Sequence, residues 1–84
     1  MLRASGVELA RLVARSLVER GFYAARHSTS ILVMRDERVV ASIHVYGSEC
    51  ILRPYKPYMS VNSAFIAEIE ELLSRLCGSV ERPW

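Results

Sequence analysis

The residues best suited to chemistry in this sequence are two histidines, one aspartate, two cysteines and several serines. Neither His27 nor His44 has aspartate, glutamate or cysteine neighbours at the spacing of a metal site. Asp36 lies where a turn is expected, and no serine stands in the Gly-x-Ser-x-Gly sequence of hydrolases. We therefore expect a chain without a catalytic site, a metal or another cofactor.

The most distinctive motif is Arg-Pro-Tyr-Lys-Pro-Tyr at residues 53–58. Its prolines remove backbone donors, so the segment should leave the sheet as a stiff, extended loop. Such a loop presents Arg53, Tyr55, Lys56 and Tyr58 to bases and phosphates, which aromatic rings and cations bind. The alternative is a structural connection whose tyrosines cover the edge of the core.

Cys50 and Cys77 stand where buried residues are expected, one in a strand and one at a helix end. Two cysteines in a chain of 84 residues do not make a secreted disulfide framework. We expect reduced, buried thiols. The alternative is a disulfide of the kind that intracellular proteins of hyperthermophiles retain.

The composition, with 51% hydrophobic and 24% charged residues, is that of a globular chain with one core. Its apolar stretches are shorter than the roughly 18 residues of a membrane span. We expect a cytoplasmic protein that does not contact a membrane. The charge is uneven, because residues 1–58 carry a net +4 and residues 59–84 a net −2. Basic character thus falls on the first helix and the sheet.

Apolar periodicity predicts two amphipathic helices with four strands between them. Ser5 and Glu8 form a capping box for the first helix, Gly21 ends it, and Ser60 is the expected N-cap of the second. The expected strands are residues 22–27, 31–35, 39–46 and 49–53, joined by two-residue turns at 28–29, 36–37 and 47–48.

The predicted fold class is therefore α+β. It is a two-layer sandwich of helix, antiparallel β-meander of three to four strands, and helix, with both helices on one face of the sheet. We expect residues 1–78 to form a single domain and residues 79–84 a C-terminal tail.

Counting pairs outward from the turns assigns the strand residues to two faces. The first face is almost wholly apolar and should lie under the helices; it comprises Tyr23, Ala25, Leu32, Met34, Val39, Ala41, Ile43, Val45, Cys50 and Leu52. The second face carries every arginine of the sheet; it comprises Arg26, Ile31, Val33, Arg35, Arg38, Val40, Ser42, His44, Tyr46, Glu49, Ile51 and Arg53.

The second face mixes basic, aromatic and aliphatic side chains, which suits phosphate contact combined with stacking. The same mixture suits an isologous dimer interface, and a solvated face covered by arginine stems is a third interpretation. The expected binding residues for nucleic acid or a protein partner are Arg26, Arg35, Arg38, His44, Tyr46, Arg53, Tyr55, Lys56 and Tyr58.

Residues 6–46 resemble the start of archaeal Holliday-junction resolvases and related restriction-endonuclease-like nucleases. The matching features are the helix that bears Glu8, the sequence Glu-Arg-Gly-Phe at 19–22 before a strand, and Arg26 followed by a serine-rich turn and a hairpin.

That family holds a divalent metal with a helix glutamate, a strand aspartate and a Glu-x-Lys motif. Here Glu8 matches the glutamate, whereas Ser30 takes the aspartate position, and His44 and Tyr46 take the positions of Glu and Lys. The resemblance implies a diverged, non-catalytic relative that retains DNA binding or dimerisation.

These observations predict a small, non-catalytic, homodimeric module that associates with DNA or RNA. The alternative is a protein-interaction or homo-oligomerisation module with no nucleic-acid role.

Overall fold

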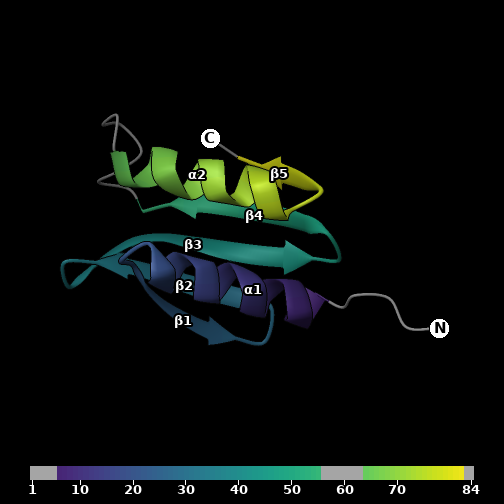
Figure 1. The fold of residues 1–84 in the computed structure, drawn as a ribbon, viewed down its shortest axis with the longest axis horizontal. Helices are drawn as coiled ribbons and strands as arrows, with labels where there is room; N and C mark the ends of the chain where they lie inside the picture. The colour runs from purple at the N-terminus through teal and green to yellow at the C-terminus, as the bar shows by residue number, and fades with distance from the viewer. Residues whose placement is uncertain (1–5, 56–63, 83–84) are drawn as a thin grey trace.

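The computed structural model describes residues 6–55 and 64–82, in the order helix, four strands, helix and strand (Figure 1). The elements are α1 (Gly6–Glu19), β1 (Tyr23–His27), β2 (Ser30–Arg35), β3 (Arg38–Tyr46), β4 (Glu49–Pro54), α2 (Ala64–Leu76) and β5 (Ser79–Glu81). The predicted α+β class is confirmed. Within the described residues the sheet has five strands, not three or four.

The local signals for α1 and the turns are confirmed where the structure describes them. Gly21, two residues after the end of α1, adopts a φ of +95°, and its N–H donates to the carbonyl of Val18. All three connections from β1 to β4 are two-residue turns at the predicted positions. Ser5 and Ser60, the two expected N-caps, lie outside the described residues.

The sheet is mixed, because β5 runs parallel to β4 at the edge beyond it (Figure 1). Residues 79–81, predicted as part of a tail, therefore form a strand, in which Val80 pairs with Cys50. The N–H of Gly78 donates to the carbonyl of Ser48 at 2.7 Å, which joins the entry of β5 to the turn before β4. The strand forms because the open edge of β4 offers unpaired backbone groups to which even a short segment can bond. Three residues are too few to show this pairing in the sequence pattern.

The pairing of β2 with β3 contains a bulge at Val40. Val33 pairs with Ala41 and Met34 with Val39, so Val40 lies between two paired residues without a partner of its own. Its side chain is fully buried, and its carbonyl accepts a hydrogen bond from the N–H of Tyr55 at 2.7 Å. The extra residue shifts the register of β2 by one position relative to β3.

This shift makes the predicted face assignment wrong for β1 and β2. Ile31 and Val33 are buried, with exposures of 1% and 0%, whereas Leu32 is 40% and Tyr23 63% exposed. Side chains alternate across a strand, so a slip of one residue moves the whole β1–β2 hairpin to the opposite face. For β3 and β4 the assignment is confirmed at the core residues Ala41, Ile43, Val45, Cys50 and Leu52. At the start of β3 it is wrong, because Val40 is buried and Val39 pairs with Met34 on the side away from the helices.

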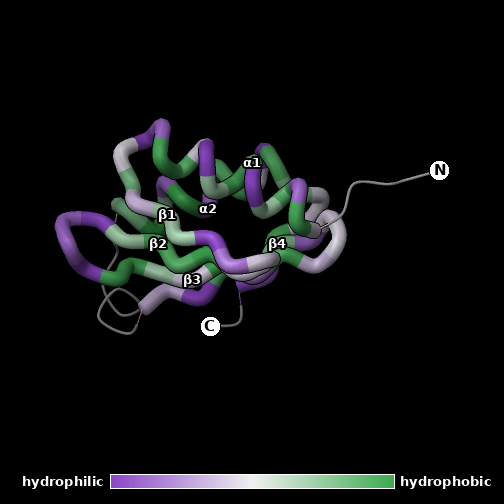
Figure 2. Tube along the Cα trace, turned by 90° about the horizontal axis from the view of Figure 1, so that it is seen from below, coloured by the Kyte–Doolittle hydropathy of each residue, from purple (hydrophilic) through white to green (hydrophobic). Residues whose placement is uncertain are grey.

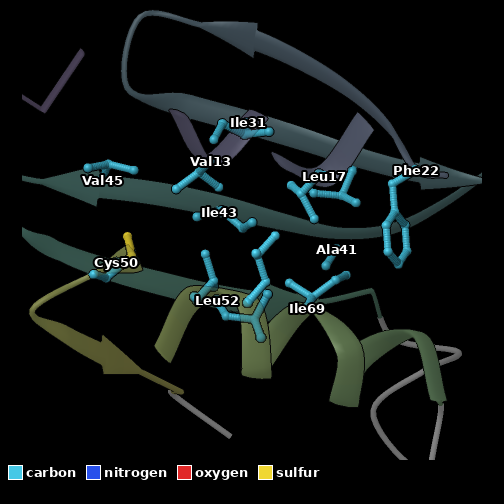
Figure 3. Close-up of a cluster of buried hydrophobic side chains, with 14 of the residues drawn as sticks. Val13, Leu17, Phe22, Ile31, Ala41, Ile43, Val45, Cys50, Leu52 and Ile69 are labelled. Carbon is cyan, nitrogen blue, oxygen red and sulfur yellow. A yellow bond between two sulfur atoms is a disulfide. The ribbon is translucent and has the colours of Figure 1, made fainter. Parts of the chain in front are cut away.

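Both helices pack against the buried side of the strands. Val13 and Leu17 from α1 meet Ile43 and Leu52 from the sheet and Ile69 from α2 in one cluster (Figure 3). Figure 2 shows the two helices on the same side of the strands, which leaves the other side of the sheet uncovered by described residues. Neither described helix has the length and apolar character needed to cross a membrane.

Strand β4 extends to Pro54, one residue further than predicted. Pro54 is buried and pairs with Ala41, although it cannot donate to a ladder. The partner strand β5 covers only residues 49–51 of β4, so Pro54 has a neighbouring strand on one side alone. The 53–58 segment thus begins within the sheet, and residues 56–58 lie outside the described part of the chain.

Cys50 and Cys77 form a disulfide, so the expectation of two reduced thiols is wrong. The bond joins β4 to the residue after α2, with Cα atoms 6.1 Å apart, and both cysteines are buried in the core. The positions are 27 residues apart in sequence, and only the docking of α2 beside β4 brings them together.

Removing this bond should lower the free energy of unfolding. For a loop of 27 residues the chain-entropy model gives roughly 3–4 kcal/mol, and we expect about 2–4 kcal/mol for the Cys50→Ala/Cys77→Ala variant. Urea unfolding with and without reductant measures the effect. Reductant should destabilise the native chain and leave the double variant unchanged; a native chain insensitive to full reduction would contradict the expectation.

A matched pair of substitutions tests the register that the bulge imposes. Ile31→Ala should cost about 2–5 kcal/mol because it leaves a cavity in the core. Leu32→Ala, one residue along the same strand, should cost less than about 1 kcal/mol because the side chain faces solvent. Equilibrium unfolding of both variants gives the comparison, and the reverse order would support the register without a bulge.

Candidate functional site

No described helix covers the side of the sheet away from α1 and α2, which is termed the outer face (Figure 2). The register assigns to it Tyr23, Ala25, His27, Ser30, Leu32, Met34, Val39, Ser42, His44, Tyr46, Glu49, Ile51 and Arg53. Its β1–β2 half is mainly apolar and its β3–β4 half mainly polar. The outer face therefore does not have the arginine-rich composition that the sequence predicted.

Three of the predicted binding arginines do not lie on the outer face. Arg26 pairs with the core residue Ile31, and Arg35 and Arg38 pair with each other on the same, helix-covered side. Arg26 is exposed and donates from Nη1 to the carbonyl of Ser28 at 2.9 Å. Of the predicted sheet residues, only His44, Tyr46 and Arg53 share the outer face, because the bulge moved the others.

Arg35 is held by aromatic rings at the end of the core. Its Cζ atom lies 4.7 Å from the ring centroid of Phe22 and 4.9 Å from that of Phe65, which comes from α2. The two rings pack edge to face at 6.1 Å. Nη1 of Arg35 is buried and, among the described residues, has no hydrogen-bond partner. This guanidinium therefore joins the sheet to α2 by cation–π contact.

The remaining predicted residues lie beyond the sheet or outside the description. Tyr55 follows β4 and is 54% exposed. Lys56 and Tyr58 lie outside the described residues.

The outer face contains a hollow of about 200 Å³ over strands β2, β3 and β4. Its lining consists of Ser30, Ser42, Ile43, His44, Tyr46, Ile51 and Arg53. Oγ of Ser30 lies 2.9 Å from Nδ1 of His44, which fixes the imidazole ring. The ring of Tyr46 packs on the same imidazole with centroids 4.5 Å apart. Ser42 and Arg53 are a directly opposed pair on β3 and β4.

Every polar side chain that lines this hollow can donate a hydrogen bond, and none is a carboxylate. Two larger hollows, of about 540 and 320 Å³, differ in this respect, because Glu70 and Glu71 line the first and Asp36 and Glu37 the second. Arg53 forms no ion pair with any described residue. The hollow thus combines an arginine with three hydroxyl groups and an imidazole, an arrangement suited to an anion.

The Ser30–His44 pair has the spacing of a nucleophile and its base, but the lining supplies no acid to orient the imidazole. The described residues also contain no cluster of three His, Cys, Asp or Glu side chains that could hold a metal ion.

Two residues of the hollow, Ser30 and Ser42, were not among the predicted binding residues. Ser42 could have been found, because it alternates with His44 and Tyr46 along one strand. Ser30 could not have been found from the expected register, since it faces His44 only after the one-residue shift.

The positions that resemble the nuclease motif divide between the two sides of the sheet. Ser30, His44 and Tyr46 meet in the hollow, whereas Glu8 belongs to α1, which packs on the opposite side, and does not line it. Comparisons with protein-family models, curated proteins and solved structures found no match.

The positions of Arg35 and Arg38 predict different effects on stability. Arg35→Ala removes the cation between two rings and should lower the free energy of unfolding by about 1–2 kcal/mol. Arg38→Ala, at the position paired with Arg35 but exposed, should change it by no more than about 0.5 kcal/mol. Urea unfolding of both variants makes the comparison. Equal effects would show that the aromatic contact does not stabilise the fold.

Proposed function

We propose that this protein is a small, non-catalytic module that binds phosphate groups of nucleic acid at the hollow of the outer face. The observation that carries the proposal is the lining of that hollow, in which Arg53 and four other hydrogen-bond donors converge without a carboxylate. Phosphate oxygens are acceptors only, so a pocket made of donors matches them.

The contacts within the hollow support this ligand. When Ser30 donates to Nδ1 of His44, the other ring nitrogen carries the proton and donates towards a bound anion. Arg53 supplies the charge, and Ser42, directly opposite, supplies a hydroxyl. Tyr46 is 60% exposed beside the imidazole and offers a ring for base stacking.

The proposal implies modest affinity. One arginine contacts few phosphates, so the protein should bind in the range of nonspecific complexes, with Kd about 10⁻⁴–10⁻⁶ M at moderate salt. Single strands suit the site better than duplex, because Tyr46 can stack only on unpaired bases.

We propose a cytoplasmic protein whose domain has two layers, with both helices on one face of the sheet. A stable disulfide in that compartment is typical of hyperthermophilic organisms, whose intracellular proteins retain such bonds. The Cys50–Cys77 bond therefore fits a cytoplasmic protein of such an organism.

A second candidate function is supported by the apolar half of the outer face. Tyr23 and Leu32 are large and exposed there, next to Ala25 and Met34. Exposed apolar surface on a sheet is typical of contact with another protein. Under this alternative the protein is an interaction module with no nucleic-acid role.

Binding of labelled single-stranded DNA, duplex DNA, junction DNA and RNA, measured by fluorescence anisotropy across a salt series, tests the proposal. The native chain should bind with affinity that falls as salt rises. Arg53→Gln should weaken binding at least tenfold and reduce the salt slope by about 1.

Arg38→Gln is the matched control, because it removes the same charge from the opposite side of the sheet. It should reduce binding less than threefold. No salt-sensitive binding at micromolar protein and low salt would reject the proposal and favour the interaction module. If Arg38→Gln and Arg53→Gln weaken binding equally, binding depends on the net charge of the protein and not on the hollow.

A further inference from the structure

Strand β1 forms one edge of the sheet, and no described residue pairs with its outer side (Figure 1). An open strand edge presents unpaired N–H and C=O groups that can pair with another strand. Natural edges are often protected by proline, bulges or several charged side chains; β1 has no proline and no bulge in its pairing with β2, and Arg26 is its only arginine, lysine or carboxylate. The opposite edge is protected by its shortness, since β5 has only three residues.

The sequence of β1, Tyr-Ala-Ala-Arg-His, is compatible with antiparallel pairing to its own copy. With Ala25 on a two-fold axis, Ala25 faces Ala25 of the second copy, and Tyr23 faces the second copy's His27. The side chains of Tyr23, Ala25 and His27 all lie on the outer face, so the two ends of the new ladder gain aromatic pairs. Tyr23 is 63% exposed in the single chain and has room for this contact.

On the helix-covered side of β1, this pairing also avoids contact between like charges. Arg26 then faces Ala24 of the second copy, so its long side chain meets a small residue and not another arginine. No like charges are directly opposed in this register, whereas a shift that opposed Arg26 to itself would be repulsive.

We infer that the protein forms a homodimer by antiparallel pairing of β1 with β1 of a second copy, centred on Ala25. The dimer has a continuous ten-stranded sheet, because each copy contributes five strands. Its two-fold axis is perpendicular to the sheet, so both outer faces lie on the same side and both sets of helices on the other. This inference depends on β1 alone and does not require the proposed phosphate site.

The arrangement places the two hollows on one continuous surface. With strands about 4.8 Å apart, two hollows that are each centred on β3 are roughly 25 Å apart in a flat sheet. A single extended polyanion could contact both, which would raise the apparent affinity through a local concentration effect.

A site-specific cross-link tests the register. Both native cysteines are in the disulfide, so Ala25→Cys introduces the only free thiol of the chain. Directly opposed residues of an antiparallel pair have Cα atoms about 4.5–5.5 Å apart, within reach of a disulfide. Mild oxidation should convert most of the Ala25→Cys protein to a covalent dimer, seen on non-reducing gels.

Neighbouring positions supply the controls. In the inferred register, residue 26 of one copy lies about 8 Å from residue 26 of the other, too far for a disulfide. Arg26→Cys and Ala24→Cys should therefore cross-link at least tenfold more slowly than Ala25→Cys. An equal mixture of the Ala24→Cys and Arg26→Cys proteins should cross-link into heterodimers.

Sedimentation of the native chain gives an independent measurement. It should show a dimer, and Ala25→Lys should be a monomer with an unchanged circular dichroism spectrum, because two lysines would meet on the axis. A monomeric native chain, a dimer that persists in Ala25→Lys, or equal cross-linking at 24, 25 and 26 would each overturn the inference. Unchanged nucleic-acid binding in Arg53→Gln, with the dimer intact, would overturn only the proposed function.

Discussion

The bulge at Val40 determines how the two halves of the sheet relate to each other. A single extra residue in β3 shifts its partner β2 by one position, and β1 follows because it is paired with β2. This shift buries Ile31 and Val33 under the helices and leaves Leu32 exposed. The core therefore depends on one unpaired residue, whose carbonyl is satisfied by the N–H of Tyr55 at the end of β4.

The same shift creates the candidate site. In a ladder without the bulge, Ser30 would be opposite Ile43 and would point towards the helices. With it, Ser30 pairs with His44 and its hydroxyl holds the imidazole. The shift also removes Arg26, Arg35 and Arg38 from the outer face. A broad basic surface is thus replaced by a small hollow in which Arg53 is the one cation among the lining residues.

The two edges of the sheet are stabilised in different ways. At the β5 edge, the disulfide and the Gly78–Ser48 hydrogen bond join a three-residue strand and α2 to β4. The ion pair between Arg82 and Glu70 at 2.7 Å adds a contact at the end of that strand. A chain of 84 residues buries a modest core, so one covalent cross-link there contributes a large share of its stability. The β1 edge has no comparable cover among the described residues.

The sequence by itself determined the elements whose signals are local. The apolar stripe and Gly21 defined α1, and the turn residues at 28–29, 36–37 and 47–48 defined the hairpins, because capping and tight turns depend on neighbouring residues. The faces of β4 and of β3 from Ala41 onward followed from alternation alone, whereas Arg38, Val39 and Val40, at and before the bulge, lie opposite to their predicted sides. Within the site, His44, Tyr46 and Arg53 were found because they alternate on those two strands.

Only the tertiary structure decided the features that join distant segments. Neither Val40 nor its neighbours carry a signal for a bulge, because a bulge forms where packing under two helices favours burying Ile31 and Val33. Docking of α2 beside β4 brought Cys77 to Cys50 and allowed residues 79–81 to pair as β5. Ser30 reached His44 because of the register shift at the bulge. Such contacts depend on how elements pack, and local residue patterns do not encode the register that packing selects.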